Sequence, residues 1–474
     1  MLDGRPAGLV KAVAESVTAL FCDEALPTLR EYTAIECLSP AFDADWETHG
    51  ALDRAAALLA EWCAARAVEG SVEVVRLAGR TPVILAELPG EAERGTTLVY
   101  GHLDKQPALG PWREGLAAFR AVQEGDRLYG RGTADDGYAT FAAFSALEAL
   151  ARHEVSRGRV VVLIEGSEES GSPDLDAYLD HLAPRIGEVA LVICLDSGCA
   201  TYDRLWVTTS LRGVLVGTLT VSVLTEGVHS GHAGGIVPSS FRLARSLLSR
   251  VEDERDGSIL LPELLGPGIP AHRRAQIAEV AAQFGEAAAG QFPLVGGLQL
   301  SGEDAASRLE AGTWGSALEV TGASGLPEPA AGGNVLRPST TLKLSVRLPP
   351  NADAVAAAAA LTATLTAAPP AGAAVTVAME QPGQGWDAPD SAPWLEEALR
   401  GASLEHFGEP PAALGLGGSI PFMAALGLRY PGCQFVATGV LGPESNAHGP
   451  NEFLHLPTAC RVGAVVAEVL AAAP

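Results

Sequence analysis

The sequence predicts a mixed α/β protein into which a second, smaller α+β domain is inserted. Short apolar segments alternate with helical segments between residues 70 and 200, a pattern typical of buried strands and helices that share one mixed sheet. The order of segments changes between residues 209 and 385, and the first pattern then resumes. We therefore expect a discontinuous domain from residues 1–208 and 386–474, with residues 209–385 forming the inserted domain.

The first domain is predicted to begin with helices and to continue with strands. Apolar residues recur at helical spacing between residues 6 and 66, which predicts two helices. The segments that follow are short, rich in β-branched residues and bounded by Gly or Pro, which is typical of strands. The predicted elements are strands at 72–77, 82–88 and 96–100, a helix at 138–152, a strand at 159–164, a helix at 174–182 and a strand at 190–195.

The inserted segment predicts strands packed against two helices. Its expected elements are a strand at 213–224, a helix at 241–250, a long Gly/Ala/Pro-rich stretch, a strand at 340–348, a helix at 353–367 and a strand at 374–380. The alanine run 356–360 is also compatible with a membrane or partner helix, but alanine is weakly apolar and Pro369-Pro370 ends the run. A helix covering one face of a sheet is the better interpretation. A helix at 393–407 and a strand at 434–438 return to the first domain.

The composition excludes several classes of protein. The 474 residues include 32 Lys+Arg and 57 Asp+Glu, a net charge of −25 that argues against nucleic-acid binding. The first residues lack the basic and apolar regions of a secretory signal, and no apolar run is long enough to span a membrane. We therefore expect a cytoplasmic protein with no membrane partner. The seven cysteines are scattered without CxxC spacing, so neither a disulfide framework nor a thiolate zinc site is indicated.

Candidate ligands follow three predicted strands. His102 and Asp104 end the first, and residues two apart in a strand face the same side. Glu168 and Glu169 follow the second strand, and Asp196 follows the third. Ligands of open α/β sheets bind at the carboxyl ends of strands. Taken singly, His102 is better interpreted as a satisfied core or surface histidine, and the adjacent acids Asp135 and Asp136 before a helix are better interpreted as helix caps.

Two further segments add donors of the same kind. Asp135 lies in a glycine turn before a helix, and His448 lies in a Gly/Pro loop near the C-terminus. Imidazole and carboxylate donors without cysteine favour Zn²⁺, Mn²⁺ or Co²⁺, and these donors suffice for two ions sharing a carboxylate. Such a pair would hold a bridging hydroxide for amide hydrolysis. Adjacent loop residues diverge in direction, so Glu168 and Glu169 can divide the tasks of general base and ligand.

Eight sequence motifs resemble those of a known family. They occur in the same order as in that family and extend over about three-quarters of the chain. They are GHLDKQP (101–107), LYGRGTADDG (128–137), EGSEESGS (165–172), CLDSG (194–198), VHSGHAGG (228–235), SVRLPP (345–350), GGSIP (417–421) and NAHGPNE (446–452). Together they resemble the M20 aminoacylase/carboxypeptidase-type metallopeptidases, especially the branch of carnosinase-like dipeptidases. The resemblance implies a mixed-sheet, zinc-peptidase-like catalytic domain with an inserted α+β lid and dimerisation domain.

The resemblance also implies roles for individual residues. Two divalent ions, Zn²⁺ first and Mn²⁺ or Co²⁺ as alternatives, would be bound by His102, Asp135, Glu169, Asp196 and His448, with Asp135 bridging. Glu168 would be the general base and Asp104 would orient His102. His229 would reach the active site of the other subunit of a homodimer joined through the lid, and help to hold the carbonyl oxyanion. Arg347, Gly418 and Ser419 would grip the terminal carboxylate of the substrate, and Asn334 would lie near a lid position that contacts it.

The resulting functional hypothesis is hydrolysis of dipeptides or similar small amides. The sequence departs from the family pattern at three points: the lysine expected after Asp136 is missing, Lys105 stands where an apolar residue is usual, and the usual W…DPF element is represented only by Trp112 and Phe119. We expect Lys105 and residues 108–119 beside the mouth of the site. These departures leave room for an amidohydrolase or N-deacylase acting on a specialised amide. A third hypothesis is a non-catalytic, peptidase-like binding protein. The presence of the predicted general base and of all five predicted metal ligands argues against it.

Overall fold

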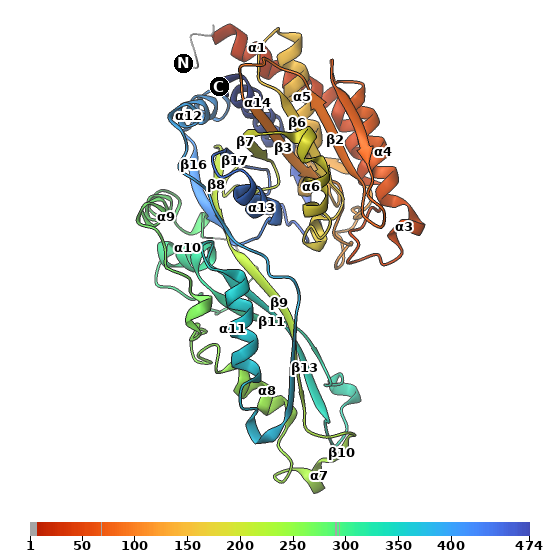
Figure 1. The fold of residues 1–474 in the computed structure, drawn as a ribbon, viewed down its shortest axis with the longest axis vertical. Helices are drawn as coiled ribbons and strands as arrows, with labels where there is room; N and C mark the ends of the chain where they lie inside the picture. Colours follow the sequence, from red (N-terminus) through yellow and green to blue (C-terminus); the bar gives the residue numbers. More distant parts are fainter. Residues whose placement is uncertain (1–6, 68, 290–291, 293) are drawn as a thin grey trace.

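The protein is described by a computed structural model that covers residues 7–67, 69–289, 292 and 294–474. Residues 1–6, which belong to the segment predicted to lack a secretory signal, lie outside this part, as do residues 68, 290, 291 and 293. The chain forms a broad α/β body and a narrower, elongated body that extends from it (Figure 1). The first and last described helices, α1 (Ala7–Ala19) and α14 (Leu456–Ala472), both lie in the broad body, so the elongated body is formed by the middle of the chain.

A six-stranded mixed sheet forms the centre of the broad body. Its strands, in spatial order, are β1 (Ser71–Val75), β2 (Val83–Leu88), β6 (Val160–Glu165), β3 (Thr96–His102), β7 (Val189–Cys194) and β17 (Gln434–Ala437). The first two neighbouring pairs are antiparallel and the last three are parallel. Strands β2, β3 and β6 are almost entirely buried, as expected for a sheet covered on both faces. The predicted α/β class with a mixed sheet is confirmed.

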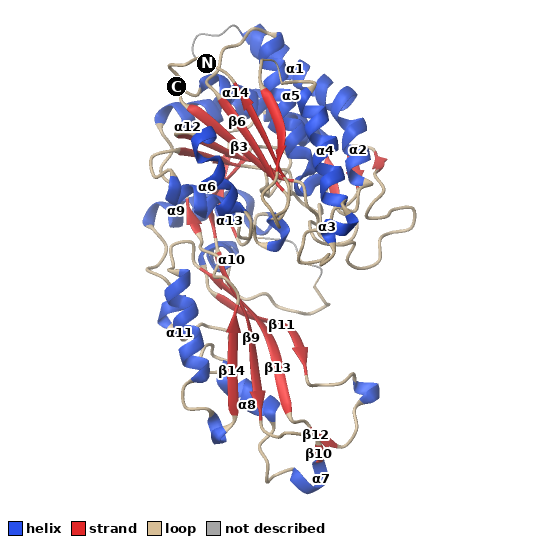
Figure 2. Ribbon diagram, turned by 45° about the vertical axis from the view of Figure 1, so that its right-hand side comes forward, coloured by secondary structure: helices blue, strands red, loops and turns tan. Residues whose placement is uncertain are grey.

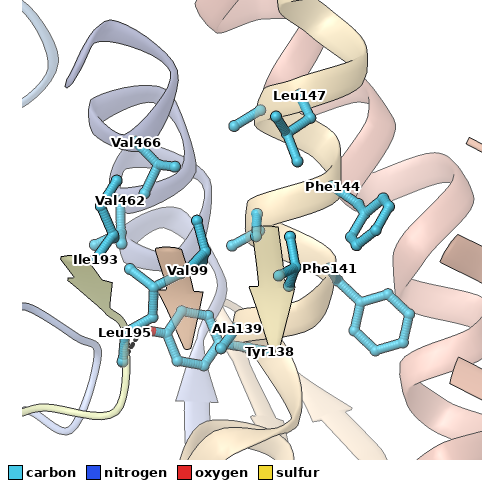
Figure 3. Close-up of a cluster of buried hydrophobic side chains, with 14 of the residues drawn as sticks. Val99, Tyr138, Ala139, Phe141, Phe144, Leu147, Ile193, Leu195, Val462 and Val466 are labelled. Atoms are coloured by element: carbon cyan, nitrogen blue, oxygen red, sulfur yellow. Dashed lines mark hydrogen bonds between the residues drawn. The ribbon is translucent and has the colours of Figure 1, made fainter. Parts of the chain in front are cut away.

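Helices cover both faces of this sheet. One face packs against α1 (Ala7–Ala19), α4 (Ala51–Ala64), α5 (Tyr138–Arg152), α12 (Pro393–Phe407) and α14 (Leu456–Ala472), and the other against α6 (Leu175–Ile186) and α13 (Pro421–Arg429). Figure 3 shows Val462 and Val466 of α14 near Val99 of β3, whereas Phe141 and Phe144 point to the other side of α5, where their rings contact Trp62 of α4. This packing anchors α5 and the turn before it to the strands.

The elongated body is an antiparallel sheet with helices on one face. Its strands follow the order β11 (Ala317–Ser324), β13 (Ser339–Leu348), β9 (Gly213–Ser222) and β14 (Ala374–Met379). Burial alternates along β9 and β13, and their buried side chains pack with α8 (Ser240–Leu248) and α11 (Ala354–Thr366). At the tip, β10 (Val228–His229) pairs with β12 (Val335–Leu336) beside α7 (Ser230–Ala233) (Figure 2).

A three-stranded sheet lies where the two bodies meet. It contains β15 (Trp386–Asp387), β8 (Trp206–Leu211) and β16 (Ala412–Leu416), and β8 leads through one residue into β9. The predicted boundary at residue 208 thus falls inside a strand. The remaining helices and strands are α2 (Leu26–Thr33), α3 (Trp46–His49), β4 (Val122–Glu124), β5 (Arg127–Tyr129), α9 (Ala271–Phe284), α10 (Ala305–Trp314) and β18 (Phe453–His455).

Most predicted elements of the sheets agree with the structure within a few residues. The two helices expected before residue 66 are instead α1, a π-helical segment at Leu20–Ala25, α2, α3 and α4. The Gly/Ala/Pro-rich stretch contains α9, α10 and β11, and the C-terminal segment contains α14, none of which the sequence analysis identified. Among the residues that the structure describes, none of the helices has the length and apolar character to cross a membrane.

Candidate metal centre

The parallel strands bring three predicted ligand segments to one edge of the sheet. Strand β3 lies between β6 and β7, and all three run in the same direction. His102 is the last residue of β3, Asp196 follows the end of β7, and Glu168 and Glu169 lie in a short 3₁₀ turn after β6. The carboxyl ends of neighbouring parallel strands coincide, so segments distant in sequence become neighbours in space.

Asp135 lies between two groups of imidazole and carboxylate side chains. Its Oδ1 atom is 3.2 Å from Nε2 of His102, and its Oδ2 atom is 3.1 Å from Nε2 of His448. The same His102 nitrogen is 3.9 Å from Asp196 Oδ2, and the same His448 nitrogen is 3.2 Å from Glu169 Oε2. Each oxygen of Asp135 therefore faces a different histidine, and the Nε2 atom of each histidine faces one further carboxylate.

Glu168 and Glu169 occupy different sides of this arrangement. Potential ligand atoms of His102, Asp135 and Glu169 lie within 4.8 Å of one another, and so do those of His102, Glu168 and Asp196. Glu169 also accepts a hydrogen bond of 2.7 Å from Nε2 of Gln106. The two adjacent glutamates thus point to opposite halves of the cluster.

The electrostatics of the cluster show an excess of negative charge. Burial, and then the charge of Asp196, hold the pKa of Glu168 well above its usual range, and burial raises the pKa of Asp196 to about 7. Burial acts in the same direction on Asp135, but hydrogen bonds from His102 and His448 hold its pKa below the usual value. Burial opposes protonation of His448, yet Asp135 and Glu169 raise its pKa to about 11. The positively charged groups of the protein therefore do not neutralise all of these carboxylates.

The donor set fits divalent cations. Two imidazoles and three carboxylates supply only nitrogen and oxygen atoms, which suits Zn²⁺, Mn²⁺ and Co²⁺. Buried like charges at such distances require a cation or a proton between them. Asp136 adds to this requirement, because it is buried and its Oδ1 atom has no hydrogen-bond partner among the described residues.

Asp104 connects His102 with the turn that carries both glutamates. Its carboxylate accepts hydrogen bonds from the backbone nitrogens of Glu168 and Glu169, at 3.1 and 3.0 Å. Nδ1 of His102 lies 3.5 Å from Asp104 Oδ1 and closer, at 3.1 Å, to the Asp104 carbonyl oxygen. Both the side chain and the backbone of Asp104 therefore face His102, and the carboxylate also fixes the glutamate turn.

A buried ion pair joins two of the ligand loops, and the sequence analysis did not identify it. Glu452 and Arg131 are almost completely buried and bonded to each other. Glu452 also accepts hydrogen bonds from the backbone nitrogens of Gly132, Ala134 and Asp135. Arg131 donates to the carbonyl oxygen of Gly449, next to His448. Arg131 lies in the motif LYGRGTADDG and Glu452 in the motif NAHGPNE. Their place in these two motifs was the sequence signal that could have identified the pair.

The expectation that Lys105 lies beside the mouth of the site is wrong for its side chain. Lys105 is fully buried, and its Nζ atom donates to the carbonyl oxygens of Tyr32, Thr33 and Ile35 at the end of α2. A cation at the C-terminal end of a helix satisfies free carbonyls and interacts favourably with the helix dipole. Lys105, which departs from the family pattern, thus stabilises the C-terminal end of α2.

The predicted substrate-binding residues fall into two places. Nη1 of Arg347 donates to Oγ of Ser419 at 3.0 Å, so Arg347 on β13 meets the loop that contains Gly418. His229 and Asn334 lie instead at the tip of the elongated body, where the backbone nitrogen of Ser230 donates to the Asn334 carbonyl. His229 is exposed there, far from the strand ends (Figure 1). Within one chain, the structure does not bring His229 or Asn334 to the metal centre.

Comparison with known families decides the identity of this arrangement. The model of peptidase family M20/M25/M40 matches residues 98–472, which is most of the chain and includes every predicted ligand. The chain belongs to this family. It is therefore a peptidase, and the resemblance read from the sequence motifs is confirmed. Metallopeptidases of this family use divalent metal ions, in agreement with the His/Asp/Glu cluster.

Individual relatives are similar over most of the chain or over part of it. The cysteinylglycine-S-conjugate dipeptidase of Corynebacterium striatum is 25% identical, over 83% of this chain and 85% of its own length. The human β-Ala-His dipeptidase is 29% identical over 40% of this chain and only 38% of its own length. The crystal structure of human carnosine dipeptidase 1 has a TM-score of 0.81, 22% identity and 99% coverage of both chains, which shows the shared fold.

Proposed function

We propose that this M20 peptidase is a dinuclear metal-dependent dipeptidase. The observation that carries the proposal is the position of Asp135, whose two carboxylate oxygens face two separate pairs of ligands. His102 and Asp196 would hold one ion, His448 and Glu169 the other, and Asp135 both. Zn²⁺ is our first choice, with Mn²⁺ or Co²⁺ as alternatives. Bound ions would act as Lewis acids toward water and the amide carbonyl.

Glu168 would perform the proton transfers. Its carboxylate lies near His102 and Asp196, and it is not one of the residues that we assign to bind the ions together with Asp135. Burial keeps its pKa high. A carboxylate in such surroundings can take a proton from the attacking water and deliver it to the nitrogen of the leaving amine. Asp104 would hold the turn of Glu168 and the ring of His102 in place through the contacts described above.

The relatives favour a small peptide as the substrate. The Corynebacterium striatum protein, which aligns with most of this chain, is named a cysteinylglycine-S-conjugate dipeptidase. A dipeptide is therefore the substrate that we propose. Arg347, Ser419 and Gly418 would bind its terminal carboxylate.

The two bodies would have separate tasks. Residues 1–208 and 386–474 would form the catalytic domain, and residues 209–385 a lid through which two chains form a homodimer. Because His229 and Asn334 lie at the tip of the elongated body, they would reach the metal centre of the second chain, where His229 would donate to the carbonyl oxyanion. The protein would act in the cytoplasm.

Amine release from a panel of substrates tests the proposal. Purified protein is loaded with Zn²⁺ or Mn²⁺ and incubated with unblocked dipeptides and with N-acyl amino acids, and a chelated sample serves as the control. Metal-dependent cleavage of the dipeptides is the expected result. Cleavage restricted to the N-acyl amino acids would contradict the dipeptidase assignment and favour a deacylase. Equal rates with and without the chelator would contradict metal dependence.

A further inference from the structure

Two cysteines lie next to each other on the helical face of the broad body, away from the strand ends that carry the metal centre. Cys22 belongs to the π-helical segment Leu20–Ala25, and Cys460 belongs to the first turns of α14. Their sulfur atoms are 3.8 Å apart although 438 positions separate them in the sequence. The contact exists because α1, which leads directly into the π-helical segment, packs along α14 (Figure 1).

The two thiols differ in accessibility and in charge. Cys22 is exposed, whereas only 7% of the surface of Cys460 is exposed. The hydrogen bond between the two sulfur atoms lowers the pKa of Cys22 to about 7, against the opposing effects of burial and of Asp23. The same contact raises the pKa of Cys460. Cys22 is thus the more accessible of the two thiols, and the contact favours its thiolate form over that of Cys460.

A surface cavity gives small solutes access to this pair. It has a volume of about 630 Å³ and is lined by both cysteines together with polar residues that include Lys11, Asp23, Glu405 and Arg461. Such a cavity admits water-sized molecules directly to the sulfur atoms. The other five cysteines, Cys37, Cys63, Cys194, Cys199 and Cys433, are buried, so small oxidants reach them less readily.

We propose that Cys22 and Cys460 form a peroxide-reactive dithiol site that closes to an intramolecular disulfide. The Cys22 thiolate attacks one oxygen of a hydroperoxide, the O–O bond breaks, and the leaving oxygen departs as hydroxide or alkoxide and takes up a proton. Cys22 is thereby oxidised to a sulfenic acid while the peroxide is reduced. The Cys460 sulfur then attacks the Cys22 sulfur, the S–O bond breaks, and water leaves with the thiol proton.

The expected result is a disulfide confined to this pair. Wild-type protein is treated with a small excess of hydrogen peroxide, the remaining thiols are alkylated, and the sample is analysed by intact mass and by peptide mapping without reduction. We expect a single chain that has lost two alkylatable thiols and contains a linked pair of peptides with Cys22 and Cys460. A dithiol reductant should reverse the change. The Cys433→Ala variant, which removes a buried cysteine elsewhere, should form the same link.

Single substitutions separate the two steps. In Cys460→Ser, a trap for sulfenic acids such as dimedone should label Cys22, because the thiol that resolves the sulfenic acid is missing. In Cys22→Ser, peroxide should leave Cys460 alkylatable. The proposal is overturned if wild-type protein yields no linked peptides while its cysteines remain alkylatable, if Cys22 forms a disulfide between chains instead, or if Cys22 proceeds to the sulfinic acid with Cys460 unchanged.

Discussion

The neighbouring residues Glu168 and Glu169 illustrate how one turn of chain separates two chemical environments. Glu169 lies beside His448 and Gln106, whereas Glu168 lies beside His102 and Asp196. The 3₁₀ turn that contains them is held by hydrogen bonds to Asp104. The sequence permitted the inference that adjacent acids diverge, but it did not contain the contact to Asp104 that fixes their directions.

Replacing Glu168 by glutamine tests its proposed role as general base. The change preserves size and removes the capacity to accept a proton, so we expect kcat to fall by about 10²- to 10⁴-fold while the metal content is retained. The exposed Glu188→Gln variant is the matched control and should keep wild-type turnover. Steady-state kinetics and elemental analysis of the same samples provide the comparison; an undiminished kcat in Glu168→Gln would remove Glu168 from the mechanism.

The buried Glu452 should be needed for stability. Glu452→Gln leaves Arg131 buried without a charged partner, and removal of one member of a buried ion pair costs about 3–5 kcal/mol of the free energy of unfolding. Glu444→Gln in the same loop is the control, because its pair with Arg127 is exposed and worth at most about 1 kcal/mol. Chemical denaturation measures both; equal small losses would show that the pair does not hold the loops.

At the level of elements, the sequence predicted the buried strands best, because a buried strand forms a short continuous apolar segment. The apolar segments that became β2, β3, β6 and β7 are bounded by turn residues, so the strand ends and their ligands followed from the pattern. Helix α14 was missed because it is buried on nearly all sides and lacks a polar stripe. Helices α9 and α10 were missed within a segment rich in Gly, Ala and Pro.

Contacts between distant residues set the limit of the sequence analysis. The ligands were predicted from strings that each occupy a few residues, and the structure brings these strings together. The direction of the Lys105 side chain depends on carbonyl oxygens at the end of α2, 72 and 73 positions earlier, and no local pattern encodes it. The same holds for the pairing of Arg131 with Glu452, which are 321 positions apart.

Helix α11 offers a test at the scale of one element. Asp353 is its N-cap, with Oδ1 accepting from the backbone nitrogen of Ala356 at 2.9 Å. Asp353→Ala should weaken the first turn by about 1 kcal/mol, which makes its amide hydrogen exchange about fivefold faster. Thr362→Ala, in the middle of the same helix, should leave that exchange unchanged. Unaltered exchange in Asp353→Ala would show that the cap contributes little.

At the level of the whole molecule, a complete active site would require two chains. The elongated body places His229 at its tip, so mixed dimers of His229→Ala and Glu168→Gln chains should contain one site with both groups intact. We expect such heterodimers to regain up to about half the wild-type activity, while each parent stays inactive. Separately tagged chains allow the heterodimer to be isolated. Well-formed heterodimers without activity would argue against a shared site.

The proposed mechanism depends on two divalent ions that share Asp135 in each chain. Equilibrium dialysis of the metal-free protein against increasing Zn²⁺ or Mn²⁺, followed by elemental analysis and by amine release from a cleaved dipeptide, tests it most directly. We expect two ions to bind per chain, turnover to rise with their binding, and Asp135→Asn to lose both together. Full turnover with a single bound ion, or wild-type stoichiometry in Asp135→Asn, would contradict it.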